Sequence, residues 1–144
     1  MSKLAHQEFE SYLFKTGSRY TIQKRLIVEE ISKIQSHFEI DDFLLRKRTQ
    51  LKNISRATLY RTIKQLLEAK MVQKITTKTG QVFYEQNFEK QNHAHLICNT
   101  CGKIQEISEE TINHWINTYC KLHNFIPEYK SIQIFGNCCH NKSK

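Results

Sequence analysis

Apolar residues recur at helical spacing in the first half of the chain and alternate with polar ones beyond it, which predicts helices followed by strands. We expect helices over 3–15, after Thr21, after Asp41, and from Ser55 to about Lys70, because Thr, Asp and Ser are favoured helix N-caps. The expected buried sides are, in chain order, Leu4, Phe9, Tyr12 and Leu13; Leu26, Ile27, Ile31 and Ile34; Phe43 and Leu44; Ala57, Leu59, Ile63, Leu66 and Leu67.

A β-hairpin is expected directly after these helices. Residues 72–77 and 81–85 alternate in polarity about the turn Lys78-Thr79-Gly80. Helices that end in a two-stranded hairpin are typical of a winged helix-turn-helix, in which the last helix enters the major groove of DNA.

The remaining residues predict a small mixed unit. Residues 86–92 are polar and unpatterned, so we interpret them as a hinge. Strands are expected over 93–98, 103–107 and 129–135, and Ser108 is expected to cap a helix between the second and third. The apolar side of that helix comprises Ile112, Trp115, Ile116 and Tyr119.

The fold class predicted from these elements is α+β. It consists of a winged helix-turn-helix domain over 1–85, a hinge over 86–92 and a ββαβ domain over 93–144. The second domain is too small to bury a stable core alone, so its apolar surfaces indicate a homodimer.

The net charge of +8 lies wholly in the first half of the chain. Residues 1–80 hold sixteen Lys and Arg against eight Asp and Glu, whereas the two signs balance in 81–144. On the fourth helix Arg56, Tyr60, Arg61 and Lys64 share one face. A solvated basic surface would explain the charge alone, but on the last helix of a winged fold this face predicts contact with double-stranded DNA.

Two kinds of metal ligand lie close together in the second half. Cys98 and Cys101 have the spacing of a zinc knuckle, and Gly102 follows where a tight turn is needed. His93 and His95 lie two residues apart on an expected strand and so share a face, and Glu106 lies on the return strand. Thiolates and N/O ligands suit different ions, so we expect one structural site and one exchangeable site.

Other functions fit the residues less well. A redox dithiol wants its first Cys at a helix N-terminus, whereas Cys98 is followed by a turn between strands. A zinc-ribbon interaction module without a sensing role stays open. We find no catalytic constellation, so no enzyme and no small organic substrate are expected. The start of the chain lacks an apolar signal segment and no apolar run is long enough to cross a membrane, which favours a reducing cytoplasm.

The chain resembles the ferric uptake regulator superfamily. The resemblance rests on His-x-His-Leu-Ile-Cys-x-x-Cys-Gly-Lys at 93–103, Ser-Arg-Ala-Thr-Leu-Tyr-Arg at 55–61 and Arg-x-Thr-x-Gln at 19–23, and it extends over nearly the whole chain. It implies a dimeric, metal-responsive transcription factor with a winged-helix domain, a hinge and a dimerisation domain.

The resemblance also implies residue roles. Tyr60 and Arg61 would contact DNA, and Arg19 would lie near the minor groove. The regulatory metal site would use His37, Glu85, His93, His95 and Glu106. The structural zinc would use Cys98, Cys101 and Cys138, with either Cys139 or His140 as fourth ligand, because Cys138 is followed by an adjacent cysteine rather than a spaced one.

The implied function is a repressor that binds an inverted-repeat operator when Fe(II) or Mn(II) fills the regulatory site. A zinc-sensing or a peroxide-sensing member of the same superfamily is the alternative, although the glutamates at 85 and 106 favour iron or manganese. Positions that supply a further metal site in many members are Asn92, Ala94, Asn113 and Lys130 here, so at most two metals per chain are expected.

Overall fold

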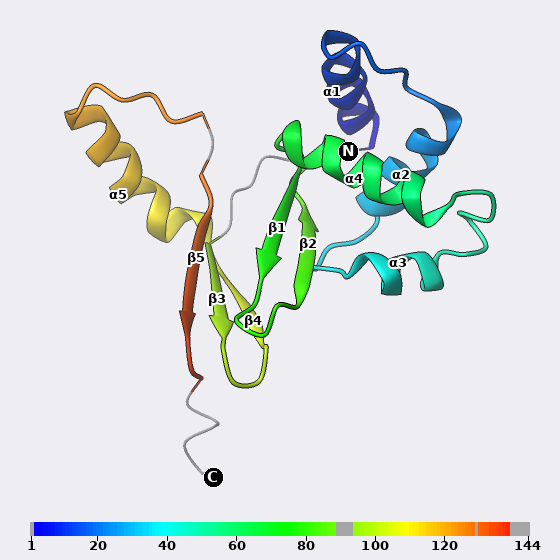
Figure 1. The fold of residues 1–144 in the computed structure, drawn as a ribbon. Coiled ribbons are helices and arrows are strands. Elements are labelled where there is room, and N and C mark those ends of the chain that lie inside the picture. The colour runs from blue at the N-terminus through cyan, green and yellow to red at the C-terminus, as the bar shows by residue number, and fades with distance from the viewer. Residues whose placement is uncertain (1, 89–93, 129, 139–144) are drawn as a thin grey trace. The chain divides into compact units, whose positions relative to one another are not determined.

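The computed structural model describes residues 2–88, 94–128 and 130–138 (Figure 1). The chain forms two compact units, one of Met1–Ile75 with Val82–Lys90 and the other of Thr76–Gln81 with Gln91–Lys144. Each unit is taken by itself below. The α+β fold class expected from the sequence is confirmed, since helices dominate the first unit and a small mixed sheet the second.

Four helices and a hairpin, apart from the hairpin tip Thr76–Gln81, make up the first unit. The helices are α1 Ser2–Lys15, α2 Ile22–Ser32, α3 Ile40–Arg46 and α4 Arg56–Glu68, and the strands are β1 Val72–Thr76 and β2 Val82–Gln86. Thr21 and Ser55 cap α2 and α4 as expected, each through a side-chain oxygen that accepts a backbone N–H of the first turn.

Asp41 is not the cap that the sequence predicts. Helix α3 begins at Ile40 with Glu39 in the N-cap position, which puts Asp41 inside the first turn. The carboxylate of Asp41 is used elsewhere, as described below. At the other end of α4, Lys70 adopts a left-handed backbone (φ 61°), so the helix stops at Glu68, short of the expected end.

One hydrophobic core lies among the helices of the first unit. Its members include Phe9, Leu13, Ile27, Ile31, Phe43, Leu59, Ile63 and Leu66, all expected from the pattern, and extend to Phe88. Three expected members, Leu4, Leu26 and Ala57, are exposed instead. Leu4 and Leu26 lie at the margins of their apolar stripes, where helical spacing alone does not decide which way a side chain faces. The expectation for Ala57 was wrong, because it lies nine residues before Leu66, on the opposite side of α4 from the core and on the exposed face that carries Arg61 and Lys64.

A bridge joins the hairpin to the loop before α3. Phe38 and Tyr84 exchange both backbone hydrogen bonds, at 2.8 and 2.7 Å. The rings of Phe38 and Tyr84 are buried, and that of Phe38 contacts Phe43 in α3. The hairpin is therefore fixed to the helices by backbone pairing as well as by packing, which is the arrangement expected of a wing.

The second unit contains a three-stranded sheet and one helix. Its elements are β3 Ala94–Cys98, β4 Ile104–Ile107, α5 Glu109–Leu122 and β5 Ile132–Gly136. The strand order is β4-β3-β5, with β4 antiparallel and β5 parallel to the central strand. The last strand begins at Ile132 rather than at 129 as expected, because its pairing starts opposite Ala94, the first residue of β3.

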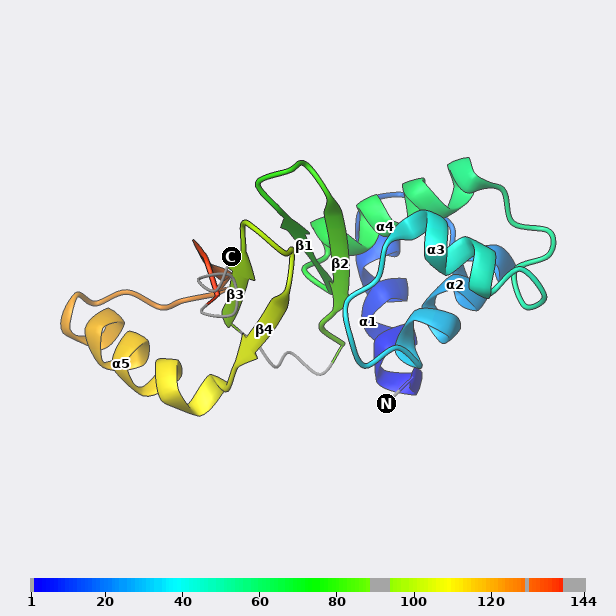
Figure 2. The same ribbon diagram turned by 90° about the horizontal axis from the view of Figure 1, so that it is seen from below.

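Helix α5 leaves much of its apolar side exposed. Figures 1 and 2 both draw it projecting away from the strands of its own unit. Trp115 is 68% exposed, and Tyr119, Leu122 and Phe125 are exposed as well. No helix in the described residues is long and apolar enough to cross a membrane.

Candidate functional site

Three cysteine side chains converge at one end of the three-stranded sheet. Cys98 ends β3, Cys101 lies in the turn before β4, and Cys138 follows β5. Their sulfur atoms lie within 4.8 Å of one another, and Sγ of Cys101 is 3.6 Å from Sγ of Cys138. Sulfur ligands about 2.3 Å from a tetrahedral zinc lie about 3.8 Å apart, so this spacing fits such an ion.

The backbone around the cysteines makes the tight turn possible. Gly102 has a left-handed backbone (φ 74°) and its N–H donates to the carbonyl of Cys98 at 3.0 Å. The hydroxyl of Thr100 donates to Asn137 Oδ1 at 2.7 Å, which ties the turn to the segment after β5. Residues far apart in sequence are thereby held beside the same three sulfur atoms.

The electrostatic surroundings favour a thiolate at Cys98. The backbone N–H groups of Cys101 and Cys138 both donate to its sulfur, each at 3.4 Å, and lower the pKa of Cys98 to about 6. The hydrogen bond with Cys101 raises the pKa of Cys138 instead. A first thiolate at neutral pH gives an incoming cation an anionic ligand at once. The candidates for a fourth ligand, Cys139 and His140, lie outside the described residues.

The histidines and glutamates expected in the regulatory metal site come from both units. In the second unit, His95 of β3 and Glu106 of β4 are direct cross-strand partners, with ligand atoms within 4.8 Å of each other. The side chain of His95 is almost wholly buried, at 1% exposure, whereas Glu106 is exposed. His93, expected to share the face of His95, lies outside the described residues.

The first unit brings His37 and Glu85 to one side of the wing. The Phe38–Tyr84 bridge is antiparallel, so His37 and Glu85 are the next residues opposite each other. Phe83 shares its face of β2 with Glu85, and the ring of His37 packs edge-on against that of Phe83, 5.0 Å between centroids. Each unit therefore presents one imidazole and one carboxylate.

The positions that the resemblance relates to a further metal site carry residues that do not suit a cation. Ala94 is buried and has no ligand atom, and the ammonium of Lys130 donates a hydrogen bond to Asn113 Oδ1. Asn92 lies outside the described residues. Among the described residues at these positions, the ammonium of Lys130 therefore lies where a metal ion would bind.

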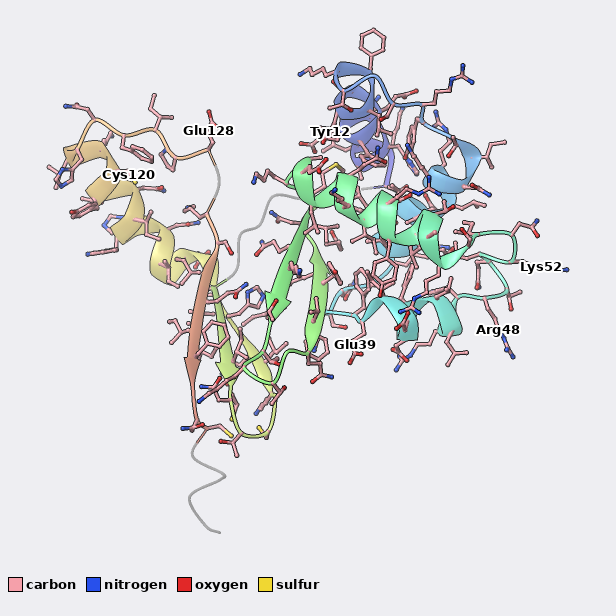
Figure 3. The ribbon with its side chains drawn as sticks, in the orientation of Figure 1. Tyr12, Glu39, Arg48, Lys52, Cys120 and Glu128 are labelled. Atoms are coloured by element: carbon pink, nitrogen blue, oxygen red, sulfur yellow. The ribbon has the colours of Figure 1, made fainter. Side chains whose placement is uncertain are left out.

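The expected DNA-contacting residues form an exposed face of α4. Arg56, Tyr60, Arg61 and Lys64 are all exposed, while Leu59, Ile63 and Leu66 of the same helix are buried. The loop between α3 and α4 adds Arg48 and Lys52 (Figure 3). Arg19 is exposed in the segment before α2.

Two residues near this face were missed from the sequence. Lys24 donates from Nζ to the carbonyl of Arg19 at 3.0 Å, and burial, followed by the nearby charge of Arg61, lowers its pKa. Lys24 lies in the first turn of α2, where its positive charge is unfavourable beside the positive end of the helix dipole. This unfavourable placement was the feature of the sequence that could have indicated an anionic partner. The other is Asp41, whose carboxylate pairs with Arg56.

Comparison with known proteins gives a consistent result. The sequence profile of the ferric uptake regulator family matches residues 15–135. A ferric uptake regulation protein of Campylobacter upsaliensis is 28% identical over 142 residues, which are 96% of this chain and 90% of that one. A zinc uptake regulation protein of Mycobacterium tuberculosis is 30% identical over 130 residues, 88% of this chain and 97% of that one. The solved Helicobacter pylori ferric uptake regulator, described as having three functional metal binding sites, is 21% identical and has a TM-score of 0.74, covering 100% of this chain and 95% of that one.

Proposed function

The chain belongs to the ferric uptake regulator family, and we propose that it is a metal-dependent, DNA-binding repressor that senses Fe(II) or Mn(II) and controls metal homeostasis genes. The observation that carries this proposal is the cross-strand pair His95 and Glu106, whose ligand atoms lie within 4.8 Å of each other. In the other unit, the antiparallel register at Phe38–Tyr84 sets His37 opposite Glu85 and supports their assignment to the same site. We infer no catalytic role, and the expected compartment is the cytoplasm.

In the proposed regulatory site, these four residues and His93 hold one exchangeable divalent ion. Imidazoles and carboxylates without thiolate suit Fe(II), Mn(II) or Zn(II). An ion with ligands from both units would fix their relative orientation and would neutralise two carboxylates that otherwise repel each other. We propose a DNA-binding domain over 1–85, a hinge over 86–92 and a dimerisation domain over 93–144. The two compact units support a division in this region, although residues 76–81 group with the second unit and residues 86–90 with the first.

A structural zinc is proposed at Cys98, Cys101 and Cys138, with Cys139 or His140 as fourth ligand. The spacing of the three sulfur atoms supports it. We propose at most two metals per chain, because the ammonium of Lys130 beside Asn113 would repel a third cation. In this respect the chain would differ from the Helicobacter pylori regulator.

DNA binding is proposed to require a homodimer. The exposed apolar side chains of α5, Trp115 and Tyr119 among them, support burial against a second copy. Two recognition helices α4, placed about 34 Å apart, would then enter successive major grooves of an inverted repeat. Arg19, Arg56, Tyr60, Arg61 and Lys64 would make the DNA contacts.

A zinc sensor is the second candidate. It is favoured by the 30% identity to a zinc uptake regulation protein, which is no lower than the identity to the ferric uptake regulation protein. The donor set of the proposed regulatory site accepts zinc as well, so the two candidates differ in the ion that fills it, not in the architecture.

The test is fluorescence anisotropy of the zinc-loaded protein on an A·T-rich inverted-repeat duplex, with Mn(II) or additional Zn(II) titrated in. We expect Mn(II) to tighten binding at least tenfold, about 1.4 kcal/mol of coupling, and His93→Ala to abolish that gain. Gln105→Ala, at an exposed position of β4 beside Glu106, serves as the control. Tightening by Zn(II) alone would establish the zinc sensor, and tight binding that ignores both ions would overturn metal sensing.

A further inference from the structure

Arg56, the first residue of the recognition helix, is engaged by a carboxylate of another helix. Its Nε lies 3.0 Å from Oδ1 of Asp41, and its Nη2 lies 3.1 Å from Oδ2. Two parallel N–H···O contacts to one carboxylate form a bidentate pair, which fixes the plane of the guanidinium as well as its position. Asp41 lies in the first turn of α3, so the pair joins the two helices of the helix-turn-helix.

The pair leaves the outer edge of the guanidinium, which is its Nη1 side, available for another partner. Of the five N–H donors of an arginine, Asp41 takes one on Nε and one on Nη2. Nη2 also lies 3.4 Å from the hydroxyl oxygen of Tyr60, and the guanidinium carbon lies 5.4 Å from the centre of that ring. Within the described residues, Nη1 has no side-chain partner. One arginine is thus held by a carboxylate on one edge and lies against an aromatic ring.

Stability does not explain this arrangement. The side chains of both Arg56 and Asp41 are more than half exposed, and ion pairs at such sites contribute little to the free energy of folding. A fixed arginine does matter for recognition, since a side chain already held in one rotamer loses less entropy when it binds. The adjacent carboxylate also reduces the attraction of Arg56 for any phosphate, which is the part of DNA binding that carries no sequence information.

We propose that Asp41 is a positioning residue for DNA sequence recognition, which holds the guanidinium of Arg56 beside Tyr60 so that its outer edge reads a base. The proposal rests on the proposed function as a DNA-binding regulator. Its direct consequence is that Asp41 raises the ratio of specific to non-specific affinity, although it is an acidic residue beside a DNA-binding face.

The experiment begins with a selection. Wild-type protein loaded with zinc and Mn(II) selects duplexes from a library with a randomised core, and anisotropy then gives the dissociation constants for the selected duplex and a scrambled one. The same two constants are measured for Asp41→Asn. Asp42→Asn is the matched control, since Asp42 is the next residue, removes the same charge, and pairs within α3 with Nε of Arg46 at 2.9 Å.

We expect Asp41→Asn to lower the ratio of the two affinities about tenfold, as for loss of one oriented base contact, and Asp42→Asn to leave it unchanged. In a repeated selection with Asp41→Asn, the lost preference should fall on one base step of each half-site. Arg56→Lys, which keeps the charge but not the bidentate geometry, should lose the same step, and adding Asp41→Asn to it should have no further effect.

Three results would contradict the proposal. An equal gain in both affinities, which leaves their ratio unchanged, would mean that Asp41 only screens the charge of Arg56, and no change in either affinity would mean that the pair has no role in recognition. Equal effects of Asp41→Asn and Asp42→Asn would mean that the change in the affinity ratio reflects only the lost negative charge. If wild-type protein enriches no sequence at all, the proposed function itself fails, and the role of Asp41 falls with it.

Discussion

The two units differ most in what they do with their apolar side chains. In the first, the core extends from Ala5 to Phe88 and contacts every helix. In the second, the described residues bury few apolar side chains, chiefly Ala94, Ile97 and Cys98, while Trp115 and Phe125 stay exposed. The first unit has a core of its own, whereas the described residues of the second do not form one.

The two units therefore obtain their stability in different ways. We expect the helical core, which is held by helix caps and by the ion pairs of the buried carboxylate of Glu30, to fold without a partner. A three-stranded sheet with one uncovered face, where the cross-strand partners Leu96 and Ile134 are both exposed, needs further burial or a crosslink. Three convergent cysteines and the apolar side of α5 offer both, so we expect the second unit to depend on metal and on a second copy.

Loss of the structural zinc should have the largest effect. Such sites contribute about 10 kcal/mol to the folding of small domains. Cys98→Ser should therefore remove bound zinc and the unfolding transition of the second unit, and leave the helical transition of the first, as measured by metal analysis and calorimetry. Cys120→Ser, a change on α5 away from the three sulfur atoms, should preserve both. Normal zinc content in Cys98→Ser would refute the site.

A charge on α5 should come next. Trp115→Glu would place a carboxylate in the proposed dimer interface twice, once per protomer. We expect the dimer dissociation constant to rise about a hundredfold, which corresponds to about 2.7 kcal/mol. Sedimentation equilibrium measures it. Phe14→Glu is the matched control, since Phe14 is 85% exposed but lies on α1 of the first unit. Equal effects of the two changes would remove the distinction between the units.

The buried carboxylate of the first unit should give a smaller effect. Glu30 is buried, and its carboxylate forms ion pairs with Nζ of Lys33 at 2.7 Å and with Nζ of Lys47 at 3.1 Å. Because both lysines are partly exposed, Glu30→Gln should cost about 2 kcal/mol, below the roughly 3–5 kcal/mol of a fully buried pair. Urea unfolding followed by circular dichroism measures it, with Glu10→Gln, an exposed partner of Arg25, as the control.

The pH dependence of that loss has a definite sign. Burial alone would raise the pKa of Glu30, but the hydrogen bonds and charges of Lys33 and Lys47 outweigh it and hold the pKa below 4.5. Its contribution to stability is therefore complete above pH 4.5 and is lost as pH falls through the lower folded value. The difference between wild type and Glu30→Gln should shrink below pH 4.5. A constant difference would show that the ion pairs do not cause it.

Local signals in the sequence predicted a large part of the fold. Thr21 and Ser55 cap helices because a cap depends on residues within one turn of it. The pairing of His95 with Glu106 follows from a short hairpin, in which the turn sets the register. The motifs at 19–23, 55–61 and 93–103, from which the resemblance was drawn, all lie within residues 15–135, which the family profile matches.

What the sequence could not supply depends on distant contacts. Asp41 was expected to cap α3 because Asp favours that position, but its carboxylate pairs with Arg56, fifteen residues later. Leu4 and Leu26 fit helical spacing and yet are exposed. Helical spacing shows which side of a helix is apolar, but how much of that side is buried depends on the elements that pack against it. The closeness of Cys138 to Cys101 was expected only from the family resemblance, because it arises from the parallel pairing of β3 with β5, which no local pattern contains.

We propose that one ion couples the units, with Glu85 contributed by the first and Glu106 by the second. The most direct test is Mn(II) binding to the zinc-loaded dimer, followed by the electron paramagnetic resonance of free Mn(II), with and without the selected duplex. Coupling is reciprocal, so DNA should tighten Mn(II) by the same factor of ten or more by which Mn(II) tightens DNA. Glu85→Gln and Glu106→Gln should each weaken Mn(II) and abolish that factor, while Glu110→Gln on α5 should change neither. Mn(II) binding and coupling that survive Glu85→Gln but not Glu106→Gln would contradict the claim, since the ion would then belong to the second unit alone.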